Sequence, residues 1–166
     1  KDVFLKEEIS FLKLKVFYMK LQIPLDEMSA LIKAKSGHEI QFTAQGKKTI
    51  KVNYDLNVKM PIVGNVSKNI SADFTIKGLE GENLYLSYSS HMLGLKSILP
   101  SLFKMFPSIN KDNLVAFTDD SDLVVDLSKI DKVHKVLEQV EIEDITFSDT
   151  SMEVLFSMKL SEQLRK

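Results

Sequence analysis

The sequence contains no cysteine among its 166 residues, which excludes disulfide bonds, a thiolate nucleophile and a cysteine-ligated metal site. It also has no run of about 18 apolar residues, so it predicts no membrane-spanning helix. Basic and acidic residues nearly balance, at 22 against 23, and they are mixed along the chain. This balance leaves no strong positive field to attract nucleic acid, and we expect no nucleic-acid partner.

The familiar catalytic and cofactor-binding motifs are missing as well. The sequence has no Gly-x-Ser-x-Gly nucleophile elbow, no Gly-x-Gly-x-x-Gly turn and no phosphate-binding loop. His38, His91 and His134 are far apart, without the neighbouring ligands that a zinc site requires. Residues 119–122 resemble part of a calcium loop, but the glycine and terminal glutamate of an EF-hand are absent. We therefore predict a protein that is not an enzyme and that uses no metal or cofactor.

What the chain does have is enough apolar residues for a core. Hydrophobic residues make up 44% of it, and its length suits a single domain over residues 1–166. Strict alternation over residues 49–60 predicts a long strand, because side chains on a strand point alternately to opposite faces. Such a strand needs long neighbours and a large cover for its apolar side chains, which are Ile50, Val52, Tyr54, Leu56, Val58 and Met60.

Alternation elsewhere predicts that strands dominate the rest of the chain. An early strand over residues 8–23 changes its apolar parity at Val16 and Phe17, which indicates either a bulge or burial of both faces. Residues 61–69 contain a proline and a glycine and predict a loop or an irregular edge. Further strands are expected at residues 40–44, 70–76, 84–88, 113–117, 122–127, 141–147 and 152–160.

Three helical segments are expected between these strands. Acidic residues in the first turn and Gly37 at the end predict a helix at Leu25–Ser36. Ser128 is the expected N-cap of a later helix, whose buried stripe would be Ile130, Val133, Val136, Leu137 and Val140.

The most apolar helix is expected over residues 92–106. Pro100 lies inside it and should kink or divide it. Two interpretations are open: a helix packed in the core, or a helix that also lines a hydrophobic cavity. Its apolar arc is wider than one sheet contact needs, and methionines suit an adaptable surface.

Together these elements predict an α+β fold built on a long antiparallel sheet. Two long strands with one apolar face each cannot cover one another unless the sheet curls. We therefore expect a strongly curved sheet wrapped around amphipathic helices, as a half-barrel or roll.

The order of these elements resembles that of a known superfamily. A long strand, a helix, a meander of long strands, a second helical segment and the run VVDLSKIDKVHKVLEQVEIEDITFSDTSMEVLFSMKL are similar to the tubular lipid-binding (TULIP) superfamily. The similarity is closest to its small bacterial single-module members, the cell-envelope lipoproteins and lipid-binding proteins. The resemblance implies a groove for acyl chains and a periplasmic or cell-envelope location.

Two functions are consistent with these patterns. The first is non-enzymatic binding of a lipid or other apolar ligand between the curled sheet and the helices. The second is a structural or protein-interaction domain with a packed core and no ligand; a cystatin-like inhibitor would leave the last seventy or so residues unexplained. In the first case the ligand site is predicted to consist of Ile50, Val52, Tyr54, Leu56, Phe74, Phe156 and Met158 on the sheet and of Leu95, Leu99, Leu102 and Phe103 on the helix.

Overall fold

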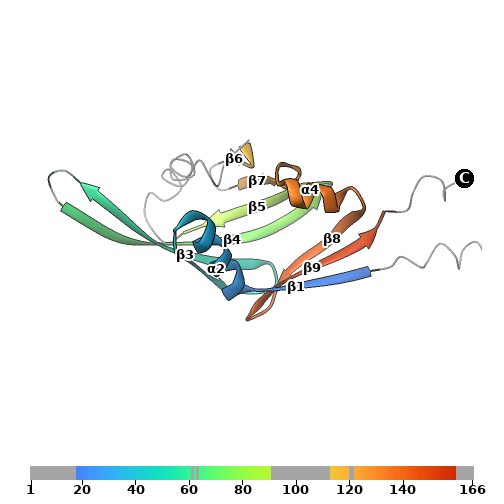
Figure 1. Cartoon of the computed structure of the whole chain (residues 1–166), viewed down its shortest axis with the longest axis horizontal. Helices are drawn as coiled ribbons and strands as arrows, with labels where there is room; N and C mark the ends of the chain where they lie inside the picture. The colour runs from blue at the N-terminus through green and yellow to red at the C-terminus, as the bar shows by residue number, and fades with distance from the viewer. Residues whose placement is uncertain (1–17, 61, 63, 91–112, 120–121, 160–166) are drawn as a thin grey trace, which may run out of the picture.

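A computed structural model describes residues 18–60, 62, 64–90, 113–119 and 122–159 of the chain (Figure 1). Strands account for most of these residues, and two α-helices and a short 3-10 helix interrupt them. The elements are β1 (Tyr18–Pro24), α2 (Leu25–Ser36), β2 (Ile40–Ala44), β3 (Thr49–Met60), β4 (Gly64–Glu80), β5 (Asn83–Ser89), β6 (Val115–Asp119), β7 (Asp122–Asp126), η2 (Leu127–Lys129), α4 (Asp131–Leu137), β8 (Val140–Phe147) and β9 (Ser151–Met158).

The described strands form two antiparallel sheets, which confirms an α+β fold with antiparallel pairing. The larger sheet has six strands in the order β2-β3-β4-β5-β7-β6, and the smaller has three in the order β1-β9-β8. Neither sheet is strongly curled or closed, so the described strands do not form the single wrapped sheet that we expected. The physical reason lies in β1, which pairs with β9 from the far end of the chain, whereas β2 begins a different sheet after α2.

β3 and β4, with 12 and 17 residues, are the longest of the described strands, and the hairpin they form projects from the rest in Figure 1. The strand expected at residues 49–60 is confirmed as β3. The loop or irregular edge expected over residues 61–69 is wrong from Gly64 onward, because β4 begins there and pairs regularly with β3 from Met60 back. Backbone hydrogen bonding to the long strand β3 therefore outweighs the local preference of these residues for a turn.

Helix α2 is confirmed within the predicted bounds. Gly37 ends it in the left-handed conformation, with φ of 73°, and donates its backbone N–H to the carbonyl of Lys33. Leu25 anchors the first turn and is only 5% exposed, whereas Leu31 is 57% exposed. The apolar stripe of this helix is therefore only partly covered by the described residues.

The later helix begins differently from the prediction. The carboxylate of Asp126 accepts the N–H of Ser128 at 3.0 Å, and this contact caps a 3-10 turn. Helix α4 then starts at Asp131 with Ile130 as its N-cap, so the assignment of Ser128 as the cap is wrong. Leu137 is buried as predicted, but Val136 is 50% exposed.

Three β-bulges interrupt the described ladders; one lies in β6, between Phe117 and Asp119, and the other two bring apolar residues onto one face. The β4–β5 register shifts between Ile76 and Gly78, and the β8–β9 register shifts between Ile142 and Asp144. Each bulge inserts one residue, which moves the following side chains to the other face. The parity change at Val16 and Phe17, which predicted either a bulge or burial of both faces, lies outside the described residues.

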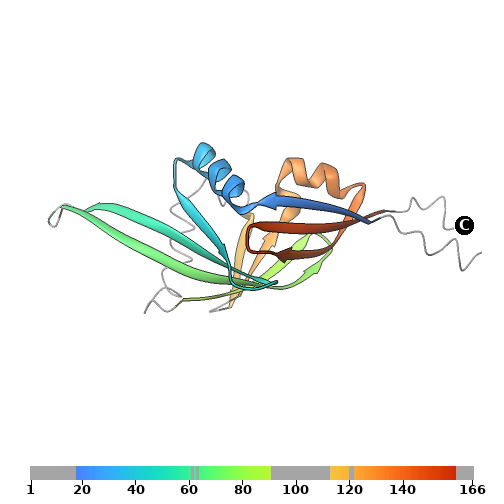
Figure 2. The ribbon, with the colours of Figure 1, turned by 90° about the horizontal axis from the view of Figure 1, so that it is seen from below.

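A few hydrogen bonds join the two sheets. The N–H of Phe147 on β8 donates to the carbonyl of Lys47 in the β2–β3 turn at 2.9 Å. Lys48 forms an ion pair with Asp144 and also donates to the carbonyl of Ile145 at 2.8 Å. Figure 2 shows α2 and α4 on the same side of the molecule, away from the long β3–β4 hairpin.

Candidate functional site

The large sheet gathers its apolar side chains on one face. Directly paired residues share a face of a ladder, and Ile50 pairs with Phe74, which pairs in turn with Tyr88. The same alternation places Val52 and Tyr54 on the face of Ile50. At its centre this face holds a buried cluster made of Ile70, Ala72, Tyr88, Val115 and Leu123. The predicted residues of β3 and β4 therefore lie together, and they adjoin a packed core.

The small sheet has a more open apolar face. Met19 pairs with Phe156, and Leu21 pairs with Val154, so these four side chains share a face. Val154 is only 6% exposed, whereas Met19 is 46% and Leu21 is 48% exposed. Met158, two residues beyond Phe156 on the same face, is 45% exposed. We call the surface formed by Met19, Leu21, Phe156 and Met158 the open apolar face.

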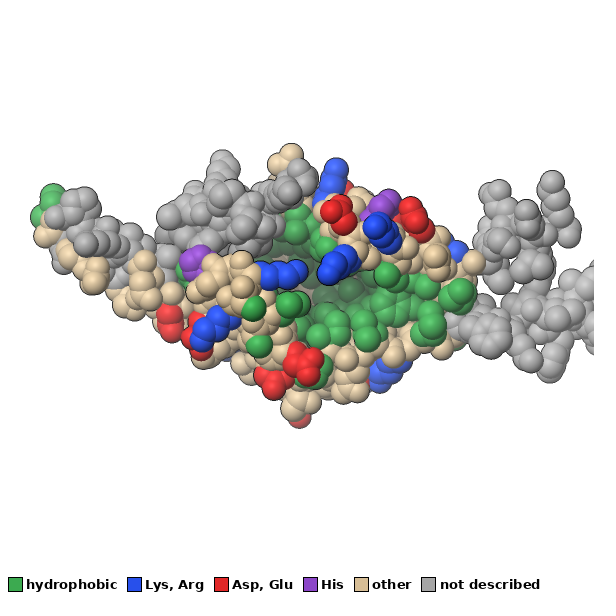
Figure 3. Space-filling view, in the orientation of Figure 1, with side chains coloured by type: hydrophobic (Ala, Val, Ile, Leu, Met, Phe, Trp, Pro, Cys, Tyr) green, Lys and Arg blue, Asp and Glu red, His purple; other side chains and the backbone are tan. Residues whose placement is uncertain are grey.

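The bulge in β8 widens this face. Before the bulge Ile142 pairs with Phe156, and after it Ile145 pairs with Val154 and Phe147 with Met152. Without the inserted residue, Ile145 and Phe147 would point to the opposite face from Ile142. Figure 3 shows a hollow with apolar side chains on the side of the molecule seen in Figure 1.

The predicted ligand residues fall into three groups. Ile50, Val52, Tyr54 and Phe74 belong to the large sheet, and Phe156 and Met158 belong to the small one, so they do not form one continuous wall of a single sheet. Leu56 pairs through its backbone with Lys68, and its side chain lies outside the described part of the structure. The helix residues Leu95, Leu99, Leu102 and Phe103 also lie outside the described residues.

Sequence reasoning did not assign Met19 and Leu21 to the site. The signal was present, because these residues alternate with polar ones along the first strand. What was missing was their partner strand: β9 follows β1 by more than a hundred residues, and only the pairing shows that Met19 lies beside Phe156.

One polar pair lies at the border of the apolar face of the large sheet. The hydroxyl of Tyr54 and Nδ1 of His38 are 3.0 Å apart, and the two rings meet edge to face. Burial raises the pKa of the Tyr54 phenol above its ordinary value of 10.0, because the ionised form loses hydration. The phenol therefore remains neutral at physiological pH and offers a hydrogen bond rather than a charge.

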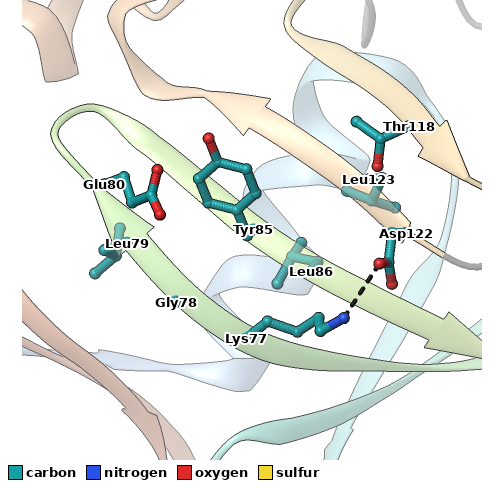
Figure 4. Close-up of a pocket in the computed structure, with 9 residues that line it drawn as sticks. All are labelled: Lys77, Gly78, Leu79, Glu80, Tyr85, Leu86, Thr118, Asp122 and Leu123. Atoms are coloured by element: carbon teal, nitrogen blue, oxygen red, sulfur yellow. Dashed lines mark hydrogen bonds and ion pairs between the residues drawn. The ribbon is translucent and has the colours of Figure 1, made fainter.

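Two further hollows, each lined by both apolar and polar side chains, lie elsewhere on the described part of the molecule. A cleft of about 760 Å³ separates β2 from the start of α2 and the β8–β9 turn. A smaller recess of about 290 Å³ lies over β4, β5 and β7 (Figure 4). In it, Lys77 and Asp122 form an ion pair of 3.1 Å, so the two charges satisfy each other. The described residues contain no group of acidic or histidine side chains placed to hold a metal ion.

No protein-family model, curated protein or solved structure matches the chain. None of the helices in the described part is long and apolar enough to cross a membrane.

Proposed function

We propose that the protein binds a lipid or another apolar ligand, without catalysing a reaction, in a groove between its sheets and helices. The observation that carries the proposal is the half-exposure of Met19, Leu21 and Met158 on one face of adjacent strands. Exposed apolar residues that occur singly are ordinary, but a contiguous group of them marks a binding surface. Membership of the tubular lipid-binding superfamily and a cell-envelope location are part of this proposal.

The chemistry of the open apolar face suits an acyl chain. Methionine is flexible and polarizable, so Met19 and Met158 can adapt to a ligand of irregular shape. Burial of a ligand gains roughly 0.8 kcal/mol per methylene group, and a chain with eight or more buried carbons can reach roughly micromolar affinity after the cost of association. A polar headgroup would remain at the rim, in contact with water.

The position of the proposed site differs in part from the one expected from the sequence. The buried cluster around Tyr88 and Leu123 fills the centre of the apolar face of the large sheet. This packing favours the second candidate function, a packed interaction domain, for that part of the molecule. The ligand is therefore placed mainly against the small sheet, where the apolar side chains are half-exposed.

A titration of delipidated protein with a dansylated fatty acid tests the proposal. Leu21→Asp is expected to weaken binding at least tenfold, because it places a carboxylate against the acyl chain. The matched control is Tyr18→Asp, since Tyr18 lies on the same strand, is 59% exposed and points to the opposite face. Both positions are exposed enough that neither change should unfold the protein.

Two results would reject lipid binding. One is the absence of saturable uptake at tens of micromolar fatty acid, and the other is equal affinity of the two variants. Native mass spectrometry of gently purified protein gives an independent measurement: the proposal expects added mass that organic extraction removes. Protein that carries no added mass and takes up no fatty acid would place the interaction-domain function first.

A further inference from the structure

Among the described strands, β1 and β8 end the small sheet and β2 and β6 end the large one, and β2 lacks the protection that such strands usually carry. Edge strands expose unpaired backbone groups, and proteins protect them with charges, prolines or bulges. Strand β1 carries Lys20 and ends in Pro24, while β6 and β8 each contain a bulge and acidic residues. The sequence of β2 is Ile-Gln-Phe-Thr-Ala, and among the described edges it alone has no charge, proline or bulge.

The outward backbone groups of β2 follow from its register. The N–H of Gln45 donates to the carbonyl of Thr49 at 2.9 Å, which fixes the hydrogen-bonded pairs of the hairpin. These pairs alternate along an antiparallel ladder, so Gln41 and Thr43 bond to β3. Phe42 and Ala44 therefore turn their N–H and C=O groups away from the sheet, and no hydrogen bond within the described residues occupies them.

The cleft of about 760 Å³ lies along this free edge. Gln41, Phe42 and Thr43 all line it, although successive side chains of a strand point to opposite faces. A space that touches all three must therefore run beside the edge of the strand. The other lining residues come from the end of β1, the first turns of α2 and the β8–β9 turn.

The lining of the cleft indicates the chemistry of its occupant. Phe42 and Leu25 provide an apolar floor, and the hydroxyls and amides of other residues provide polar walls. The charged residues of the lining are Asp26 and Asp149, both exposed, and no lysine or arginine is among them. An occupant with a positive charge would complement these two carboxylates.

We infer that β2 binds an extended peptide segment bearing lysine or arginine, which adds a strand to the large sheet. Backbone hydrogen bonds to Phe42 and Ala44 would supply the affinity common to added strands, and the acidic walls would select for basic side chains. This function is separate from lipid binding, because it uses an edge and a cleft rather than the open apolar face.

Amide hydrogen exchange, read by NMR on the full chain, tests the inference directly. The probe is the synthetic peptide acetyl-Lys-Thr-Val-Thr-Val-Thr-Lys-amide, compared with the same peptide bearing glutamate in place of lysine. We expect the lysine peptide to slow the exchange of the Phe42 and Ala44 amides at least tenfold. The amides of Gln41 and Thr43 serve as internal controls, because β3 already protects them. A third peptide, with lysines but with alternate backbone nitrogens methylated, cannot form the ladder and should give no protection.

Two variants separate the backbone and charge contributions. Ala44→Pro removes one outward N–H and should abolish the added protection, while slow exchange at Gln41 and Thr43 shows that the hairpin remains folded. The double change Asp26→Asn and Asp149→Asn should lower the affinity for the lysine peptide by about threefold or more. It should not lower the affinity for the glutamate peptide.

Three results would overturn the inference. Binding without protection of Phe42 and Ala44 would place the peptide elsewhere, and equal binding of the methylated peptide would exclude an added strand. Protection of the same amides without any peptide, together with a doubled mass in sedimentation, would assign the edge to a second copy of the chain.

Discussion

Leu123→Ala should destabilise the protein far more than Leu21→Ala, because only the first side chain lies in a packed core. Leu123 is 2% exposed inside the cluster with Tyr88 and Val115, whereas Leu21 is 48% exposed on β1. Truncation of a fully buried leucine removes transfer free energy and leaves a cavity, which costs about 3 to 5 kcal/mol. At Leu21 only about half of the transfer free energy is present and no closed cavity forms, so the expected cost is about 1 kcal/mol or less.

Urea unfolding, monitored by circular dichroism, measures the free energy of unfolding of both variants. The two variants should share the slope of the parent, because neither change alters the surface exposed on unfolding by much. Thermal unfolding gives a second measurement: for a chain of 166 residues, 1 kcal/mol corresponds to about 2 to 4 °C, so the melting temperatures of the two variants should differ by several degrees. Equal losses would show that the small sheet is packed as tightly as the large one, and the open apolar face would lose its basis as a binding surface.

Three further predictions concern the junction of the sheets, the partly buried phenol of Tyr54 and the end of α2. Lys48→Met should lower the free energy of unfolding by about 1 kcal/mol, since its partly exposed pair with Asp144 is screened by water; a urea curve that overlays the parent would contradict this. The raised pKa of Tyr54 means that the folded state holds its proton more tightly, so the free energy of unfolding should fall as pH rises through and above 10.0. Tyr54→Phe should remove one tyrosine component that titrates above 10.0 at 295 nm, and an unchanged titration curve would contradict this. Gly37→Ala should cost about 1 kcal/mol in thermal unfolding because φ is 73° there, whereas Gly78→Ala, with open space around it and no positive φ, should cost less.

Local chemistry was sufficient to predict many of the elements. The alternation over residues 49–60 gave β3, and the glycine that ends Leu25–Ser36 gave the C-terminus of α2. These predictions succeed because strand faces and helix caps depend on residues close in sequence. The same reasoning failed at residues 61–69, where pairing with β3 holds Gly64 and its followers in a strand despite the turn residues.

The sequence by itself determined which face of each strand is apolar, and therefore that the protein needs antiparallel sheets with a core on one side. Only the tertiary structure decided which of those faces is covered. The pairing of β1 with β9 and the buried cluster around Leu123 depend on strands that meet from distant parts of the chain. The bulges and the free edge of β2 depend on how the strands pair, which residues close in sequence do not specify. A side chain on a strand has the same orientation whether or not another layer packs against it, and that layer decides whether Leu21 belongs to a core or to a binding surface.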